Sequence, residues 1–467
     1  MRIRDGKIFK LISLMVLILL AFVSSSSEYF VFVEAQQKAL PSSQPESPTA
    51  LSKASPPPAS PKGKVPTIIN NTSNLKVELV FKGIRYPSNM VLLGPNDILV
   101  LEKNNGTVKR IANGTMLEEP LFDVNVATKD ERGMLGIAVS KHDGSTRPTY
   151  VFLYFTESKS KDGDDLQGKN PLGNRLYRYE LENNRLIKGK LLLDLPAIPG
   201  PHHNGGNVLI GPDNNLYVVI GDVETHRTQS QNIAEGPIAD GTSAIYRITQ
   251  DGKPPLDHRD NNTLVNRHLN KFYAYGVRNS FGMDFDPVTA KLWDTENGPG
   301  FGDEINLVEP GFNSGWIKVQ GIWKPQTYFG GQVASVSTDR LVDFNGTGKY
   351  SPPEFIWNQT IGVTALKFLN SDKLGKQYKD DMFVGDINNG NIYHFDLNKN
   401  RTEILLNGSL ADKIANTKEE SDKVIFANGF AGITDIEVGS DGYLYVLTFH
   451  KSQGSIYRIV PATTKAE

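Results

Sequence analysis

Six times along this chain, a short hydrophobic run is followed by a polar turn and a second hydrophobic run of similar length. The best-matched examples read LYVVIGD…SAIYRI and LYVLTFH…GSIYRI. Alternating hydrophobic residues between Gly-Pro-Asp-Asn and Ser-Asp-Gly turns are typical of antiparallel strands. The six pairs are Asp97–Leu101 with Gly106–Ile111, Tyr150–Phe155 with Asn174–Tyr179, Asn215–Ile220 with Ala244–Ile248, Lys291–Thr295 with Glu304–Val308, Asp381–Val384 with Asn391–Phe395, and Tyr443–Thr448 with Ser455–Ile459.

The spacing of these pairs predicts an all-β, six-bladed β-propeller over residues 67–467. Each repeat is roughly 67 residues long, which suits four short strands and their loops. A pair of sandwiches or a β-helix is the alternative. Because propeller rings usually close with a strand from each terminus, we expect Lys76–Phe81 to pair with the strands near Ile459.

The first residues, 1–35, have the pattern of a signal peptide. Basic residues precede the apolar run Leu11–Val23, and serines follow it. This run is short for a membrane-spanning helix, but Tyr29–Val33 is apolar again, so a retained N-terminal anchor remains open. The sequence therefore predicts an exported protein that is extracellular, periplasmic or at the cell surface, with a possible membrane tether.

Residues 36–66 are rich in Pro, Ser, Ala and Lys and contain no aromatic residue. Such a segment buries too little apolar surface to offset its ordering entropy, so we expect a disordered linker. The chain contains no cysteine, which excludes disulfides, thiolate nucleophiles and cysteine-bound metal clusters. Its net charge of −2 gives no indication of nucleic-acid binding.

Polar clusters mark four candidate loops. The loop PHHNGGN holds His203, which is either a general base or an ordinary surface histidine. In YGVRNSFG, Arg278 is either a structural ion-pair partner or an anion clamp. The loop ENGPGFGDE is rich in the oxygen ligands that calcium prefers, although a solvent-facing acidic turn would read the same. The segment KDERGMLG, with Glu131, reads by itself as an exposed turn.

Together these loops carry a family resemblance. ERGMLGIAV, HNGGNVLIGPDNNLYVVIGD, YGVRNSFGMDFDP and ENGPGFGDEINLVEPGFNSGW follow in this order across residues 131–316. The series resembles the soluble quinoprotein glucose/sorbosone dehydrogenase family, including the PQQ-dependent aldose sugar dehydrogenases. Flanking similarity runs from Tyr86 to Ile459. The resemblance implies PQQ- and calcium-dependent oxidation of the anomeric carbon of aldoses to lactones, with electrons passed to an exported acceptor that the sequence does not identify.

The resemblance also assigns roles to residues. It makes His203 the general base that takes the proton of the sugar's C1 hydroxyl, and Arg278 the cation that stabilises negative charge on a quinone oxygen. Both are the implied catalytic residues. The implied cofactor contacts are Glu131, His203, Arg278, Asn279, Asn297 and Trp357, and the implied calcium ligands are Asn297, Gly298 and Pro299.

One part of the family pattern is absent. Sugar dehydrogenases of this type usually hold the cofactor's carboxylates with a lysine and two arginines, and the matched positions here are Asn388, Gly432 and Thr434. Each lost charge-assisted contact costs about 1.5–3 kcal/mol of binding free energy. An alternative function therefore stays open: a non-catalytic, calcium-containing propeller that binds carbohydrate or protein at the cell surface. A calcium-dependent lactone or ester hydrolase is a more distant alternative.

Overall fold

The computed structural model describes residues 66–69, 74–140, 148–159, 171–224, 226–257, 268–323, 338 and 340–462. The predicted signal peptide or anchor and, apart from Pro66, the predicted linker lie outside these residues. The chain divides into the units Met1–Ala54 and Ser55–Glu467, and the fold below is that of the second. Among the described residues, no helix is long and apolar enough to cross a bilayer.

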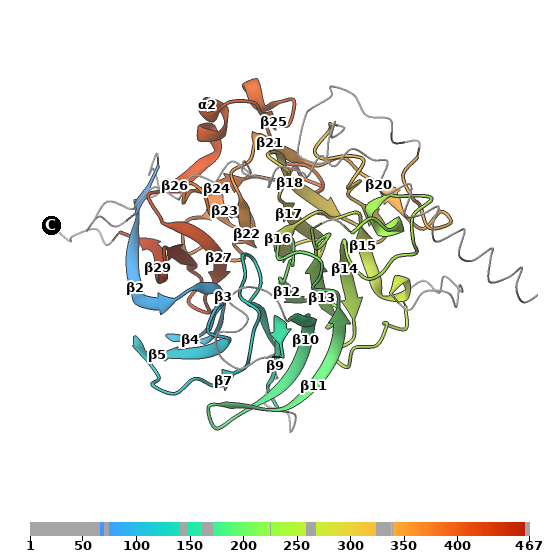
Figure 1. The fold of residues 1–467 in the computed structure, drawn as a ribbon. Coiled ribbons are helices and arrows are strands. Elements are labelled where there is room, and N and C mark those ends of the chain that lie inside the picture. The colour runs from blue at the N-terminus through green and yellow to red at the C-terminus, as the bar shows by residue number, and fades with distance from the viewer. Residues whose placement is uncertain are drawn as a thin grey trace, which may run out of the picture. The chain divides into compact units, whose positions relative to one another are not determined.

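The second unit is an all-β propeller with very little helix, as the repeats predicted (Figure 1). Strand pairing divides its strands into six sheets. The first contains β3 (Pro87–Gly94), β4 (Asp97–Glu102), β5 (Thr107–Ala112), β6 (Thr115–Met116) and β7 (Phe122–Asp123). The second contains β8 (Met134–Ser140), β9 (Tyr150–Ser158), β10 (Pro171–Glu182) and β11 (Arg185–Leu195). The third contains β12 (Val208–Ile210), β13 (Leu216–Ile220), β14 (Ala244–Ile248), β15 (Phe272–Tyr275), β19 (Phe312–Asn313) and β20 (Lys349–Tyr350).

The remaining sheets follow the same plan. The fourth contains β16 (Ser280–Phe285), β17 (Leu292–Glu296), β18 (Phe301–Val308), β21 (Phe355–Gln359) and β25 (Ile414–Ala415). The fifth contains β22 (Val363–Phe368), β23 (Met382–Asp386), β24 (Ile392–Phe395), β26 (Ile425–Asn428) and β1 (Thr67–Ile68). The sixth contains β27 (Gly432–Val438), β28 (Leu444–His450), β29 (Gln453–Pro461) and β2 (Leu75–Arg85). The helical segments in the described residues are α2 (Lys418–Ser421) and the 3₁₀ turns Gln229–Gln231, Leu269–Lys271, Lys376–Tyr378, Gly408–Leu410 and Asp422–Val424.

Each of the six strand pairs identified in the sequence lies in a different sheet. The first strands of the sheets are β3, β8, β12, β16, β22 and β27. Those that Figure 1 labels, β3, β12, β16, β22 and β27, lie innermost. Each first strand contacts the next along the chain, with the third sheet reaching β16 through β13, and β27 contacts β3. The inner strands therefore form a closed ring.

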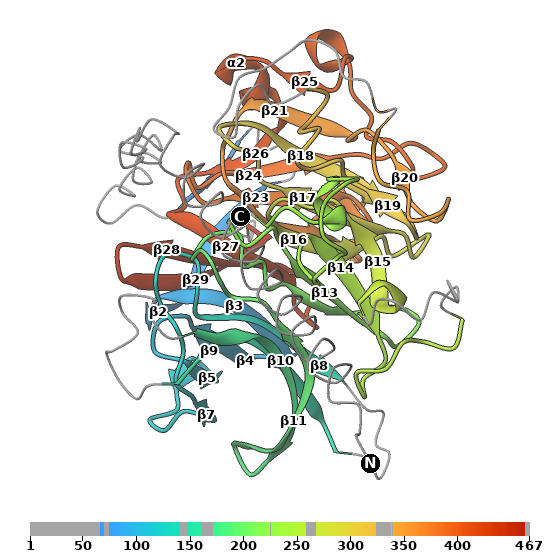
Figure 2. The ribbon, with the colours of Figure 1, turned by 45° about the vertical axis from the view of Figure 1, so that its right-hand side comes forward.

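Strands from the two ends of the described chain complete one sheet. β2 pairs with β29 in antiparallel register, with Val77 opposite Ile459 (Figure 2). This pairing confirms the ring closure expected for Lys76–Phe81.

Hydrogen bonds join the inner strands to one another. Thr364 Oγ1 on β22 donates to the carbonyl oxygen of Ile433 on β27 at 2.6 Å. The backbone N–H of Met90 on β3 donates to Asp435 Oδ2 on β27 at 2.8 Å. Because these bonds fix neighbouring blades at the axis, the loops that lead into the inner strands are held in defined positions.

Close backbone packing also occurs at the axis, and it leads to a stability prediction. A Cβ at Gly136 on β8 would lie 1.8 Å from the carbonyl oxygen of Gly206, so the Gly136→Ala protein should lose about 1–3 kcal/mol of unfolding free energy through overpacking. Urea denaturation measures the loss. The control is Gly94→Ala, because a Cβ at Gly94 meets nothing within 4 Å. Equal denaturation midpoints for the two variants would contradict the close approach.

Candidate active site

The predicted site residues lie on loops beside inner strands. Glu131 precedes β8, His203 precedes β12, and Arg278 and Asn279 precede β16. Asn297 lies between β17 and β18. Since β8, β12 and β16 belong to the inner ring, these loops converge, and direct hydrogen bonds between them show which side chains meet.

Glu131 joins two of the loops. Its Oε2 accepts a hydrogen bond from the backbone N–H of His203 at 2.5 Å. Its Oε1 and Oε2 lie 3.3 and 3.4 Å from Asn279 Nδ2. The KDERGMLG segment is therefore part of the site rather than an isolated exposed turn, and the carboxylate of Glu131 positions both the histidine loop and the Arg278–Asn279 loop.

His203 is held by a buried carboxylate. Its Nδ1 lies 2.5 Å from Asp222 Oδ1, and Trp316 Nε1 donates to Asp222 Oδ2 at 2.7 Å. Burial of Asp222 pushes its pKa upward, but the charge and hydrogen bond of His203, the charge of Arg278 and the Trp316 bond bring the pKa below its usual value. Asp222 therefore stays ionised at neutral pH and favours the His203 tautomer that carries its proton on Nδ1.

The backbone at His203 is also constrained. Its φ of 59° lies in the left-handed region, which non-glycine residues seldom adopt. Such conformations persist where surrounding contacts enforce them, and they concentrate at functional sites. Here the bonds from Glu131 to the backbone and from Asp222 to the ring supply that enforcement, and they leave Nε2 with no hydrogen-bond partner among the described residues.

Arg278 reaches the neighbouring loop. Its backbone N–H donates to Glu296 Oε1 at 2.7 Å, and its Nη1 donates to the carbonyl oxygen of Asn297 at 2.7 Å. Its guanidinium carbon lies 5.3 Å from the centre of the Trp316 ring. Nε is buried without a hydrogen-bond partner in the described part of the chain. A buried, unsatisfied cationic donor is suited to an anionic or carbonyl oxygen of a ligand.

The loop predicted to hold calcium offers uncommitted oxygens. Asn297 Nδ2 donates to the carbonyl oxygen of Val363 at 2.7 Å and to that of Asn279 at 3.3 Å, which leaves Oδ1 as the available atom. Within the described residues, no hydrogen bond reaches the carbonyl oxygens of Gly298 and Pro299. Three neutral oxygens in one turn fit a calcium ion's preference for oxygen ligands.

Asp303 holds this loop in place. Its Oδ1 accepts the backbone N–H of Gly298 at 2.9 Å, and its Oδ2 accepts those of Ile361 and Gly362 at 2.8 Å each. Burial raises the pKa of Asp303, the three N–H bonds and the charge of Arg278 lower it, and the net pKa is about 6. At neutral pH the carboxylate is ionised, and it links the turn of Gly298 to the segment before β22.

Trp357 does not join this group, so the structure corrects its assignment as a cofactor-pocket aromatic. It lies on β21, the fourth strand of its blade, away from the inner ring. The side chain is 1% exposed and packs against Phe355, Tyr393 and Phe395. Its Nε1 donates to Ser421 Oγ at 3.1 Å. The aromatic ring that does meet the site is that of Trp316.

No cationic side chain stands at the three positions that match the family's carboxylate clamp. A Cβ at Gly432 would lie 2.6 Å from the carbonyl oxygen of Ile387, which leaves no room for a long side chain. Thr434 Oγ1 is buried without a hydrogen-bond partner in the described segments. Asn388 is half-buried in the turn between β23 and β24. None of these three positions therefore presents a cationic side chain to a ligand.

A further carboxyl group is buried on β17, the strand that ends just before the candidate calcium loop. Asp294 is fully buried, neither of its oxygens has a hydrogen-bond partner in the described residues, and its cross-strand neighbour Asn306 has an unpartnered Oδ1. Burial is the largest influence on the pKa of Asp294 and raises it to about 7. A protonated carboxyl group has a donor and carries no charge, so a neutral Asp294 costs less to bury beside the unpartnered acceptor of Asn306 than an ionised one would.

This raised pKa makes stability depend on pH. The protonated form of Asp294 is favoured in the folded protein. Its contribution to the unfolding free energy is therefore complete below the unfolded-state pKa of about 4 and is lost as pH rises through about 7. The side chain of the Asp294→Asn protein cannot ionise, so this variant should avoid up to about 4 kcal/mol of that loss in unfolding free energy. Its stability relative to the parent protein should therefore be greater at pH 8 than at pH 5. Urea denaturation at both values measures it. Asp123→Asn, at an exposed position, is the control, and parallel pH profiles for parent and Asp294→Asn would contradict the assignment.

Comparison with known proteins places this arrangement. A family model described as Glucose / Sorbosone dehydrogenase matches residues 84–458. The chain belongs to the glucose/sorbosone dehydrogenase family. It is 24% identical to the aldose sugar dehydrogenase YliI of Escherichia coli over 393 residues, which covers 83% of this chain and 94% of that protein. It is 27% identical to the quinoprotein glucose dehydrogenase B of Acinetobacter calcoaceticus over 295 residues, 59% of each chain. The solved PQQ-bound aldose sugar dehydrogenase of Streptomyces coelicolor has the same fold, with a TM-score of 0.57 at 19% identity over 85% of this chain and 100% of that one.

Membership of the glucose/sorbosone dehydrogenase family indicates a sugar-oxidising oxidoreductase.

Two residues that complete the site were not singled out from the sequence. Asp222 lies two residues after the end of the buried strand β13, and Trp316 ends the GFNSGW segment. A polar residue just after a fully buried strand, as in the sequence IGD, could have indicated Asp222 as a site candidate. Nothing in the sequence indicates that Trp316 and Asp222, 94 residues apart, form a hydrogen bond.

Proposed function

We propose that this protein is a PQQ- and calcium-dependent dehydrogenase that oxidises the anomeric carbon of aldose sugars to lactones. The observation that carries the proposal is the pair His203–Asp222. The buried carboxylate holds Nδ1 at 2.5 Å and leaves Nε2 free, on the loop that Glu131 ties to Arg278 and Asn279.

The residues fit calcium well and PQQ in part. The oxygens of Asn297, Gly298 and Pro299 would hold calcium. The unsatisfied Nε of Arg278 suits a quinone oxygen. Glu131 adds a negative charge nearby, and no lysine or arginine stands at the clamp positions to meet the cofactor's carboxylates. Bound PQQ would supply the two-electron acceptor for the hydride that leaves C1.

The chain's own residues account for the proton and for charge stabilisation. With a proton on Nδ1, the Nε2 lone pair of His203 accepts the proton of the C1 hydroxyl as the C1–H bond breaks, and the C1–O bond becomes the lactone carbonyl. Asp222 stabilises the imidazolium that forms, since it remains ionised and within hydrogen-bond distance. The Arg278 guanidinium, fixed by Asn297 and beside Trp316, stabilises negative charge on an acceptor oxygen.

Reconstitution of the purified protein tests this function. Aldose-dependent reduction of a dye should require both PQQ and calcium, and chelation of calcium should lower the rate. Failure to bind PQQ at tens of micromolar, with the protein folded and calcium present, would overturn the dehydrogenase assignment. Export and the N-terminal tether belong to the same proposal; cell fractionation with N-terminal sequencing tests whether residues 1–35 are removed.

The absent clamp favours a second candidate, a non-catalytic, calcium-containing propeller that binds carbohydrate or protein at the cell surface. In that case the His203 loop would bind a ligand without oxidising it. The same reconstitution separates the two candidates, because only the dehydrogenase produces lactone.

Restoring one clamp cation should strengthen PQQ binding. Asn388→Lys places an ammonium group at the matched position, and one charge-assisted contact is worth roughly a tenfold or greater gain in affinity. Quenching of tryptophan fluorescence on titration with PQQ measures it. Asn388→Met has similar length without the charge and is the matched control; equal affinities for the two variants would show that this position does not face the cofactor.

A further inference from the structure

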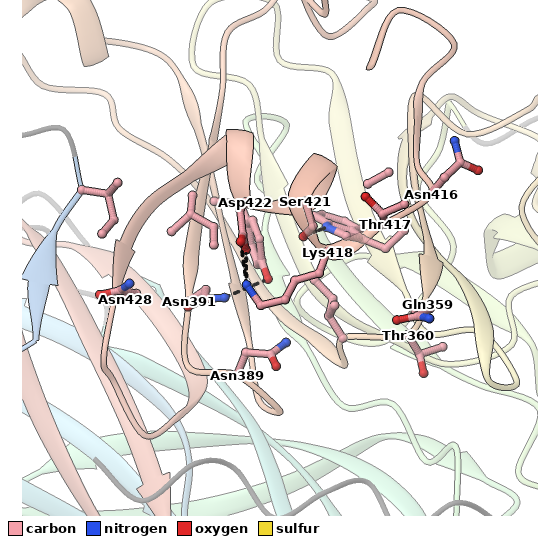
Figure 3. Close-up of a pocket in the computed structure, with 16 residues that line it drawn as sticks. Gln359, Thr360, Asn389, Asn391, Asn416, Thr417, Lys418, Ser421, Asp422 and Asn428 are labelled. Carbon is pink, nitrogen blue, oxygen red and sulfur yellow. Dashed lines mark hydrogen bonds and ion pairs between the residues drawn. The ribbon is translucent and has the colours of Figure 1, made fainter. Parts of the chain in front are cut away.

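A pocket of about 570 Å³ lies where outer strands of the fourth and fifth sheets meet (Figure 3). Its walls come from β21, β24, β25 and β26, from the turn between β23 and β24, and from α2. The volume is within the range of about 300–1,000 Å³ that is usual for small-molecule sites. None of the candidate active-site residues lines this pocket except Trp357, which the structure separates from the His203 group.

Amide and aliphatic hydroxyl side chains make up eight of the sixteen residues that line the pocket, and most of the others are apolar. Figure 3 shows amide and hydroxyl groups on several sides of the space. The side chains of Gln359, Thr360 and Asn389 have no hydrogen-bond partner within the described residues, and Asn391 Oδ1 accepts none there. The polar lining includes Gln359, Thr360, Asn389, Asn391, Asn416 and Asn428. Carboxamides and hydroxyls both donate and accept, so together they match a ligand that does the same.

The charges at the pocket cancel each other. Lys418 Nζ lies 2.7 and 2.6 Å from the two carboxylate oxygens of Asp422. These are the only charged side chains among the lining residues. The pocket therefore offers no free cation to an anionic ligand and no free carboxylate to a cationic one. An apolar ligand is disfavoured as well, because it would bury the unpaired amides without replacing their hydrogen bonds to water.

Part of the pocket is fixed before any ligand binds. Asp386 is fully buried, and it accepts the backbone N–H groups of Asn389 and Gly390 at 2.5 and 3.0 Å and the hydroxyl of Tyr393 at 2.8 Å. Asn391 Nδ2 in turn donates to that hydroxyl oxygen at 3.2 Å. Asn389 and Asn391 are thus presented from a turn that a buried carboxylate holds, which lowers the entropy cost of binding.

We propose that this pocket binds a neutral saccharide unit, at a site separate from the His203 group. A sugar ring carries several neutral hydroxyls that each donate and accept, and it has apolar C–H faces that can contact Ile361 and Tyr393 in the lining. The inference goes beyond the proposed oxidation, since it concerns binding without chemistry and holds whether or not PQQ binds.

Asp303 connects the two places. Ile361 lines the pocket and its backbone N–H donates to Asp303 Oδ2, while Asp303 Oδ1 accepts the N–H of Gly298 in the candidate calcium loop. A saccharide in the pocket therefore rests on a segment that one buried carboxylate ties to the active-site loop.

Binding to the full-length protein without PQQ tests the proposal. Saturation-transfer NMR with maltose and cellobiose should show contact with the protein, and isothermal titration should give dissociation constants at least about tenfold weaker for Asn389→Ala and Gln359→Ala. Asn407→Ala is the matched control, because this exposed asparagine makes no side-chain cap bond and lies outside the pocket. Thr360→Val removes only a hydroxyl and keeps the shape, so it reports on the pocket if a larger change prevents folding.

The His203→Ala variant tests whether the pocket is independent of the active site. Saccharide binding in the pocket should be unchanged in this variant. Saccharide binding that is lost in His203→Ala but kept in Asn389→Ala and Gln359→Ala would overturn the proposal, and so would absence of binding to the folded parent protein. Glucuronate and a lysine-rich peptide serve as charged probes; tighter binding of either than of the neutral sugars would also contradict it.

Discussion

Replacing His203 by alanine should lower the turnover of the proposed aldose oxidation by about 10²–10⁴-fold, and the proposed calcium and PQQ should still bind. The imidazole is the only group in the described site that has a free basic nitrogen on a loop fixed at both its backbone and its ring. Its loss removes the proton acceptor and leaves the oxygens of the Asn297–Pro299 turn unchanged. Dye-linked turnover, together with a fluorescence titration of PQQ, measures the two effects separately.

The neighbouring histidine is the natural control for this experiment. His202 lies on the same loop, but its Nδ1 is 3.3 Å from Glu224 and its Nε2 is 3.7 Å from Asp130, both at the surface. His202→Ala should therefore retain most of the turnover. Comparable losses in the two variants would mean that the loop, rather than the base on it, was disturbed.

Substituting Asp222 by asparagine should lower turnover by about 10²–10⁴-fold with little change in the fold. Asp222 accepts from His203 Nδ1, from the backbone N–H of Glu224 at 3.0 Å and from Trp316 Nε1. An asparagine has one acceptor oxygen, so its NH₂ group must face one of these donors or force His203 into the tautomer with its proton on Nε2. That tautomer cannot take the substrate's proton. In steady-state kinetics, kcat should fall by a larger factor than KM changes.

A second histidine–aspartate pair supplies the comparison for Asp222. His226 Nδ1 hydrogen-bonds to Asp240 Oδ2, and His226 Nε2 to the carbonyl oxygen of Ile198 at 2.6 Å, so both nitrogens of that ring are occupied. Asp240→Asn should change stability but not kcat. An equal kcat for Asp222→Asn and Asp240→Asn would remove Asp222 from the mechanism.

The sequence predicted the blades better than it predicted the site. Strand pairs such as LYVVIGD…SAIYRI were recognisable because period-two alternation and sharp turns act locally. The two-residue strands β19, β20 and β25 carry too little pattern to be seen, and tertiary pairing alone creates them. The loops with Glu131, His203 and Arg278 were found through their motifs, and the structure brings them together.

Partners distant in sequence were the harder part of the site. The bond between Trp316 and Asp222 depends on how the segment after β19 returns to the axis, which no local pattern records. Trp357 was misassigned because residue type alone does not reveal a strand's rank within a blade. Trp357 lies on the fourth strand of its blade, so its side chain packs in the core between blades instead of at the inner ring.

The pairing of β2 with β29 also affects the order of events during synthesis. The sixth sheet takes its outermost strand from near the start of the described chain and its other three from the end, so it cannot form until Gln453–Pro461 has been made. Contacts that join distant parts of a chain form slowly, and β2 must wait with an unpaired edge until its partner arrives. For a chain that is exported as proposed, this delay would keep the ring open while the polypeptide is threaded across a membrane, and the propeller would close only on the far side.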